Sequence, residues 1–264
     1  MKIGIVIPFK SKEVSKNWDV TCRNLKATVD SVLAQTSGDY TAVVVGHDCP
    51  DFFKSEHYKN SKCNFLHYED FSPPKIGPDE MQNQLKYEFD RCTKILRGIM
   101  QIKENDPSVT HWFSLDADDL IHDNFVSILS SYERAGAIIL DKGYFLFKST
   151  GIINKEDEFS AYCGSSSVIS DRYFDLPGTI DEKSYRRTPF GNISHVHMKQ
   201  RMLEDGVKVL VPDERLIMYV RDNGENISND AYCNTFYKKF KKCIKMIVKY
   251  RFVRKDVKAH FGLN

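Results

Sequence analysis

Three carboxylates follow directly on one apolar segment of this chain. Residues 112–121 read Trp-Phe-Ser-Leu-Asp-Ala-Asp-Asp-Leu-Ile, so Asp116, Asp118 and Asp119 stand at the end of a predicted buried strand. Carboxylates this close raise one another's pKa unless a cation lies between them. Hard cations prefer oxygen ligands, and Mg²⁺ commonly combines one or two carboxylates with substrate phosphates. The block therefore predicts a Mn²⁺ or Mg²⁺ site that holds a phosphate ester.

The same residues also fit an ordinary polar turn. Asp is frequent in turns because its side chain hydrogen-bonds to nearby backbone groups. On this interpretation Asp119 caps the helix that follows, and the block holds no metal.

The elements before the block form a βαβ unit. Residues 3–7 are a continuous apolar run typical of a strand buried in a parallel sheet, and Pro8 ends it. Apolar residues recur at helical spacing over 22–35, and a second buried strand over 41–46 ends at Asp48. A right-handed crossover makes the two strands parallel, so both open on the sheet edge where α/β proteins bind ligands.

The remaining pattern continues the alternation of strands and helices. We expect a single α/β domain with a mixed, mostly parallel central sheet flanked by helices. The further predicted elements are strands at 64–67, 137–140, 143–147, 207–211 and 216–220, an apolar-polar segment at 165–169, helices at 78–103, 123–135 and 194–205, and a loop at 177–192.

Composition bears on the compartment. Seven cysteines without a CxxC pair among 264 residues indicate reduced thiols rather than a disulfide framework. The apolar part of the N-terminus is too short for a signal peptide, and no run approaches the roughly 18 apolar residues of a transmembrane helix. We expect a cytoplasmic protein, at most peripheral at the inner face of the membrane.

The order of elements resembles the glycosyltransferase A-type fold, with the closest likeness to family 2 glycosyltransferases. The likeness covers roughly residues 1–228. It rests on the strand ending at Pro8, the helix with Thr-Val-Asp-Ser-Val-Leu-Ala-Gln-Thr, the Val-rich strand ending at Asp48, the long helix, and Leu-Asp-Ala-Asp-Asp. It implies a catalytic domain over 1–230 that moves sugar from a nucleotide-sugar donor, UDP-sugar favoured, to a glycan, a lipid-linked glycan or another hydroxyl acceptor in polysaccharide synthesis.

The resemblance also implies roles for residues around the donor. Asp116 would face the ribose or the metal, and Asp118 would be the main metal ligand bridging the diphosphate. Arg221, in the segment 219–228 that resembles the family's closing motif, would reach the diphosphate. The other implied donor contacts are Pro8 and Phe9 where the nucleotide enters, Asp48 at the uracil or ribose, and Lys94 near the nucleotide.

Two small residues fall where the family places its acceptor side. These are Gly164 and Ser165. They would leave space for a sugar ring, or they simply turn the chain.

The sequence departs from the family at the general base. The family's late helix begins with a Glu-Asp pair, where this chain has Ser194 and His195. His195 could accept the acceptor's proton, since an imidazole has a pKa near 6.5. Alternatively, His195 or His197 is the third metal ligand; the two side chains point about 200° apart on a helix, so they cannot easily share one role. An inverting reaction is favoured, and a retaining one stays open.

The C-terminal part of the chain is strongly basic. Residues 231–264 hold ten Lys or Arg and one acid, a net +9, which leaves −7 for the rest of a chain with net charge +2. Apolar residues at helical spacing over 236–258 predict a basic amphipathic tail. It would lie on an anionic membrane surface or pack on the acidic body. Nucleic-acid binding is not expected, because stacking platforms and known modules are missing.

Two other functions compete with glycosyl transfer. A sugar-nucleotide pyrophosphorylase-like nucleotidyltransferase would carry a Gly-rich phosphate loop after the first strand, and residues 8–12 contain no glycine. A non-catalytic nucleotide-sugar-binding scaffold would explain the missing Glu-Asp pair. The sequence favours a metal-dependent glycosyltransferase.

Overall fold

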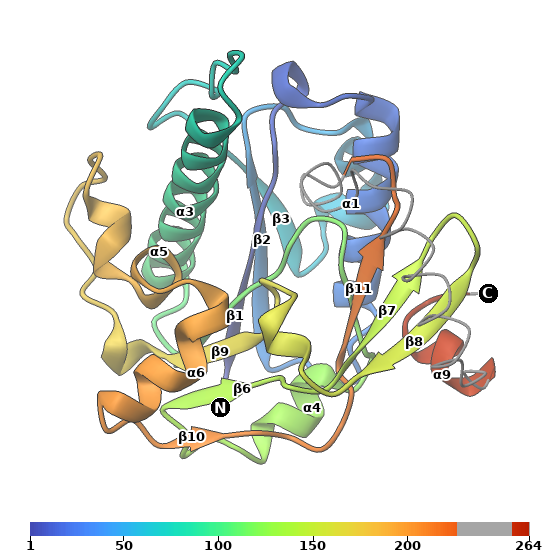
Figure 1. Ribbon diagram of the computed structural model, residues 1–264, viewed down its shortest axis with the longest axis vertical. Coiled ribbons are helices and arrows are strands. Elements are labelled where there is room, and N and C mark those ends of the chain that lie inside the picture. Colours follow the sequence, from blue (N-terminus) through green and yellow to red (C-terminus); the bar gives the residue numbers. More distant parts are fainter. Residues whose placement is uncertain (226–254, 264) are drawn as a thin grey trace.

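A seven-stranded sheet forms the centre of the computed structural model, which describes residues 1–225 and 255–263 (Figure 1). Its strand order is β10-β6-β9-β4-β1-β2-β3. Only β9 runs antiparallel to its neighbours, β4 and β6. The predicted mixed, mostly parallel sheet is confirmed. The strands are β1 (Ile3–Pro8), β2 (Tyr40–Gly46), β3 (Cys63–His67), β4 (His111–Ser114), β6 (Ala137–Ile139), β9 (Ser167–Ser170) and β10 (Val209–Leu210).

Two long helices cover opposite faces of this sheet. Figure 1 shows α1 (Trp18–Leu33) on one side of β1 and β2 and α3 (Glu80–Asn105) on the other. Side chains of β1 alternate between the faces, as a strand requires. Ile5 packs in the core under α1, and Val6 packs in the core under α3. Both faces are therefore apolar, which explains the unbroken apolar run in the sequence.

The helix starts follow from local capping. The side chain of Asn17 accepts the N–H of Val20 at 3.1 Å, so α1 begins four residues before the predicted start at 22. Asp79 accepts the N–H groups of Met81 and Gln82 at the start of α3. In both helices a polar residue just before the apolar pattern fixes the first turn.

A second sheet of four strands was not predicted from the sequence. Its order is β5-β11-β7-β8, and β11 is parallel to β7 but antiparallel to β5. Two of its strands, β5 and β8, were missing from the expected elements. The bounds are β5 (Leu120–Ile121), β7 (Gly143–Phe147), β8 (Ile152–Glu156) and β11 (Ile217–Arg221). Because β5 is only two residues long and follows the acidic block directly, no sequence periodicity reveals it.

The shorter helices differ in part from expectation. The helix predicted at 123–135 is shorter, α4 (Phe125–Ser130), with Asn124 before its first residue. The late helix, α6 (His195–Glu204), lies within one residue of the predicted bounds at each end, and Gly206 follows it with φ +72°. The other α-helices of the described residues are α2 (Glu56–Lys59), α5 (Pro189–Asn192) and α9 (Lys255–His260).

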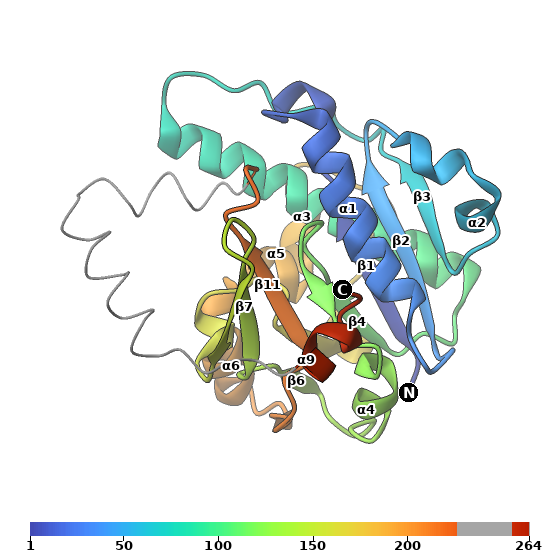
Figure 2. The same ribbon diagram turned by 90° about the vertical axis from the view of Figure 1, so that its right-hand side faces the viewer.

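The end of the chain packs on the second sheet. Phe261, after α9, is 2% exposed and meets the ring of Tyr144 edge-on at 5.8 Å. Figure 2 shows α9 beside this sheet. The domain boundary expected at 230, and most of the tail helix expected at 236–258, lie outside the described residues. The described end of the basic tail is thus part of the folded body.

The described residues bear on two expectations, the absence of a transmembrane helix and the reduced state of the cysteines. No helix within 1–225 and 255–263 has the length and apolar character needed to cross a bilayer. The five cysteines in these ranges are all free thiols, and Cys233 and Cys243 lie outside them.

The approach of α3 to the sheet depends on Gly98. A Cβ at Gly98 would lie 2.5 Å from Cγ1 of Val6 and 3.0 Å from Cγ2 of Val45. We expect Gly98→Ala to lower the free energy of unfolding by about 1–3 kcal/mol, because α3 must move off the sheet. At an exposed helix position the same change would stabilise by about 1 kcal/mol. Urea denaturation measures the sign, and Gly178→Ala in an open loop is the control, with about 0.5 kcal/mol or less expected. A more stable Gly98→Ala protein would contradict this packing.

Candidate active site

A pocket of about 1110 Å³ opens at the carboxyl ends of β1 and β4. This is the edge where α/β sheets bind ligands. Residues from both halves of the chain line it, many of them charged or aromatic: Pro8, Phe9, Lys10, Asn24, Glu88, Arg91, Lys94, Asp116, Asp118, Gly164, His195, Tyr219 and Glu225 are among them.

Asp119 faces away from this pocket into the protein. Its side chain is fully buried and accepts hydrogen bonds from Cys163 Sγ at 3.2 Å, Ser165 Oγ at 2.8 Å and the N–H of Val220 at 3.2 Å. Burial, and then the charges of Asp118 and Asp116, raise its pKa. The expectation that Asp119 caps the next helix is wrong, because the residue instead ties β11 and the 163–165 segment to the acidic block.

Asp116 and Asp118 line the pocket. Arg91 Nε donates to Asp116 Oδ1 at 3.3 Å, and Asn223 Nδ2 donates to Asp118 Oδ2 at 2.7 Å. Burial raises the pKa of Asp118 to about 6, the negative charge of Asp116 adds to this, and Asn223 and Lys10 oppose it. Two carboxylates therefore face one cavity at close quarters.

This pair fits a hard divalent cation. A bound cation would offset the repulsion between Asp116 and Asp118, which adds to the effect of burial on the pKa of Asp118. Two carboxylates are also a common protein contribution to a Mg²⁺ site, whose other ligands are waters and phosphates. The residues present thus match the donor set expected for Mn²⁺ or Mg²⁺.

His197 does not join the two carboxylates. It is exposed and lines a separate hollow with Gln200 and Arg201. Within the described residues, the group of three ligand atoms that lie within 4.8 Å of one another is found elsewhere in the fold. The structure therefore does not assemble Asp116, Asp118 and His197 into a ligand set.

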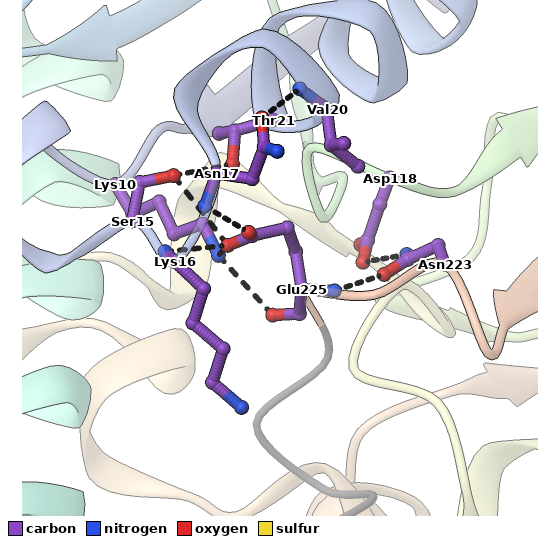
Figure 3. Close-up of polar contacts among 9 residues, drawn as sticks. All are labelled: Lys10, Ser15, Lys16, Asn17, Val20, Thr21, Asp118, Asn223 and Glu225. Carbon is purple, nitrogen blue, oxygen red and sulfur yellow. Dashed lines mark hydrogen bonds and ion pairs between the residues drawn. The ribbon is translucent and has the colours of Figure 1, made fainter.

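Two residues that follow β11, Asn223 and Glu225, fix the position of Asp118. The N–H of Glu225 donates to Asn223 Oδ1 at 2.9 Å, while Asn223 Nδ2 contacts Asp118 (Figure 3). The Glu225 carboxylate pairs with Lys10 and accepts the N–H groups of Lys16 at 3.2 Å and Asn17 at 2.5 Å. The start of α1 is thereby connected to the acidic block.

Glu225 is ionised in this setting. Burial alone would raise its pKa, but the Lys10 ion pair and the backbone N–H groups of Asn17 and Lys16 outweigh burial and lower the pKa. At neutral pH the carboxylate therefore stays charged and keeps its contacts.

Lys94 is a buried residue of the pocket that contacts the backbone just after β1. It is 1% exposed, and its Nζ donates to the carbonyl oxygen of Phe9 at 2.9 Å and to Asp90 at 2.6 Å. Burial lowers its pKa, and the Asp90 carboxylate opposes this. Lys94 holds the end of β1, where Pro8 and Phe9 line the cavity.

Two expected donor residues lie outside the pocket lining. Asp48 accepts the N–H of Lys12 at 2.8 Å. The guanidinium of Arg221 lies 5.5 Å from the ring centre of Phe145 and 5.6 Å from that of Tyr219. Both residues are near strand ends, as expected, but neither lines the cavity.

The two small residues expected on the acceptor side have different surroundings. Gly164 lines the pocket, and a Cβ there would lie 2.9 Å from Asp116 Oδ2. Ser165 is fully buried; its Oγ accepts the N–H of Asp116 at 2.9 Å and donates to Asp119. Gly164 leaves room in the cavity, whereas Ser165 positions the acidic block.

His195 lines the same cavity from the first residue of α6. Burial lowers its pKa, and the nearby Asp116 carboxylate partly offsets this. The imidazole is therefore neutral at pH 7, the state in which it can accept a proton.

Four residues of this site were not singled out from the sequence. Arg91 stands one helical turn before Lys94 on α3, which is the signal that could have found it. Asn223 and Glu225 lie in the segment 219–228, in which only Arg221 was predicted to contact the donor. Lys10 is the second residue after β1, but its partner Glu225 is 215 residues away in the chain.

Among solved structures, two of S. aureus TarS are similar to this chain. One TarS structure, of residues 1–349, has a TM-score of 0.45 and 11% identity over 83% of this chain and 60% of that chain. Another has a TM-score of 0.47 and 12% identity over 98% of this chain and 41% of that chain. This chain thus spans less than two thirds of either protein. Likenesses this distant carry no argument about activity, which must come from the site.

The sequence itself matches no known family profile and no characterised protein.

The pKa of Asp118 predicts how stability depends on pH when no metal is present. A carboxyl with a pKa of about 6 folded and 3.8 unfolded stabilises the fold while protonated. That contribution is complete below the unfolded pKa and is lost as the pH rises through about 6. The stability of Asp118→Asn relative to wild type should therefore rise by about 1–3 kcal/mol between about pH 4 and about pH 7.

Urea titrations in EDTA at the two pH values measure this difference. Asp39→Asn, at an exposed aspartate far from the block in sequence, is the control. The same Asp118→Asn effect at both pH values would refute the raised pKa.

Proposed function

We propose that this chain is a metal-dependent glycosyltransferase that moves a sugar from a nucleotide-diphosphate sugar to a hydroxyl of a glycan or lipid-linked glycan. The observation that carries the proposal is the pair Asp116 and Asp118, which face a large pocket at the carboxyl edge of the sheet. UDP-sugar is the favoured donor, and polysaccharide synthesis is the expected setting. The cofactor is Mn²⁺ or Mg²⁺.

The charges around the pocket suit a diphosphate leaving group. Breaking the bond from the sugar to the diphosphate leaves negative charge on the phosphate, which a cation held by Asp116 and Asp118 would stabilise. Arg91 and Lys10 add fixed positive charge to the same cavity. Because each is paired with a carboxylate, both are held in place before the donor binds.

His195 is the candidate general base for the acceptor hydroxyl. It lines the cavity that holds the two carboxylates, and it is neutral at pH 7. No other histidine is among the described residues that line this cavity. The resemblance to family 2 glycosyltransferases favours an inverting reaction, in which such a base removes the proton of the acceptor hydroxyl.

The setting in the cell is part of the same proposal. A donor made in the cytoplasm would be used there, with the basic residues of 236–258 attracting the protein to an anionic membrane surface. Residues 236–254 lie outside the described structure, so this rests on the sequence pattern.

Donor binding should require both the metal and Asp118. We expect one nucleotide sugar to raise the melting temperature by several degrees in the presence of Mn²⁺, and neither Asp118→Asn nor EDTA-treated protein to show the shift. A thermal-shift screen of nucleotide sugars measures this, with Asp39→Asn as the variant expected to behave like wild type. A shift that is indifferent to Asp118 would refute the metal-diphosphate site.

The released product separates the competing activities. Formation of nucleoside diphosphate indicates glycosyl transfer, whereas pyrophosphate release indicates a nucleotidyltransferase. Donor binding without any turnover would indicate a non-catalytic scaffold.

Substitution of His195, with His197 on the same helix as the control, tests whether His195 is the general base. We expect His195→Gln to lower kcat by about 10²–10⁴-fold while the donor-dependent thermal shift is kept, because proton transfer is lost and donor binding is not. His197→Gln, two residues along α6 and outside the pocket, should stay within about twofold of wild type. Equal losses in both variants would contradict a specific role for His195.

A further inference from the structure

A second group of metal-ligating side chains lies outside the pocket. His122 and Asp123 follow β5, and His260 is the last residue of α9, 137 positions beyond Asp123. Of the residues that the structure describes, these three form the group whose ligand atoms all lie within 4.8 Å of one another. Figure 2 shows α9 beside the segment of chain that leads into α4.

The three side chains converge closely. Nδ1 of His260 lies 3.0 Å from both carboxylate oxygens of Asp123, and Nδ1 of His122 lies 3.0 Å from Oδ1. The imidazole rings stack with centres 4.4 Å apart and planes 16° from parallel. All three side chains are partly exposed, so an ion from solvent can reach them.

The backbone fixes this arrangement from both ends of the chain. The N–H of Asp123 donates to the carbonyl oxygen of His260 at 2.9 Å, and the carbonyl of Asp123 accepts the N–H of Thr36 at 2.9 Å. The buried ring of Phe261 meets His122 edge-on at 5.4 Å. Ligands held by packing and backbone contacts lose little freedom when an ion binds.

One hydrogen bond competes with an ion at this group. The N–H of Asn124 donates to Nδ1 of His122 at 3.1 Å. An ion bound through Nδ1 would take the place of this hydrogen bond, because the nitrogen has a single lone pair. The carboxylate of Asp123 would offset part of the positive charge of the ion.

We propose that His122, Asp123 and His260 form a Zn²⁺ site separate from the pocket. Two imidazoles and one carboxylate are a ligand set that Zn²⁺ takes in proteins, with a fourth position left for water. Mg²⁺ and Ca²⁺ prefer oxygen ligands alone, so the donor set selects a first-row transition ion. The bound ion joins the end of the chain to the residues just after the acidic block and fastens α9 to the body.

Zinc binding to the full-length chain tests this site. The Asp118→Asn background removes one of the two carboxylates at the pocket, and Zn²⁺ is titrated against a chromophoric chelator. We expect one Zn²⁺ per chain, with His122→Gln and His260→Gln each weakening binding by at least about tenfold, because one of three protein ligands is lost. His67→Gln is the matched control: it is an exposed histidine whose Nε2 lies 3.9 Å from a single carboxylate, that of Glu69.

A second measurement keeps the test sharp if a variant folds poorly. In the parent protein, Zn²⁺ should slow amide hydrogen exchange over residues 255–263, and Co²⁺ should give the visible absorption bands of a site with imidazole ligands. Absence of saturable binding would overturn the proposal, and so would zinc affinity that is unchanged in His260→Gln. The test does not involve the sugar donor, so its outcome is independent of the proposed transferase activity.

Discussion

The buried carboxylate of Asp119 joins the parts of this fold that build the pocket. Burying a charged or polar group costs free energy unless hydrogen bonds replace the water that the group loses. Its three hydrogen bonds come from the 163–165 segment and from β11 of the second sheet. Satisfying Asp119 therefore brings the second sheet against the end of β4. The two aspartates that precede it, Asp116 and Asp118, line the cavity.

The opposite wall of the pocket depends on a second carboxylate, Glu225. It accepts two backbone N–H groups just before α1, where the positive end of the helix dipole favours a negative charge. The same residue fixes Asn223, which in turn donates to Asp118. The position of the Asp118 carboxylate is thus set jointly by the start of the first helix and by the segment after β11.

Local signals in the sequence were enough for much of the fold. Alternation and spacing placed β1, α1, β2, α3 and α6, because each of these buries an apolar face that repeats along the chain. The second sheet was missed because β5 has two residues and its partners are about a hundred residues away in the chain. Periodicity within a short window cannot report pairing at that distance.

The sequence predicted which residues end the strands at the site, but not the contacts between residues that are distant in the chain. Residue type and position at a strand end identified Asp116 and Asp118, but not the direction in which each side chain of the turn points. Asp119 was assigned to a helix cap although the helix begins six residues later, at Phe125. The contacts of Lys10 with Glu225, and of Asp118 with Asn223, join residues separated by 215 and 105 positions. No local pattern contains such pairs.

Residues 116–123 carry the two carboxylates of the proposed site in the pocket and two of the three ligands of the proposed zinc site, and His260 supplies the third. The first offers carboxylate oxygens alone, and the second offers two imidazole nitrogens with one carboxylate. Raw affinity for most donor sets rises from Mn²⁺ to Zn²⁺, so selectivity between neighbouring sites has to come from the ligand type. If both proposed sites are filled, the oxygen-only pair would keep a labile ion that can share a phosphate, and the imidazoles would retain a more tightly bound one. The short strand β5 lies between the two groups. It separates Asp116 and Asp118, which suit catalysis, from His122 and Asp123, which suit a role in holding α9 in place.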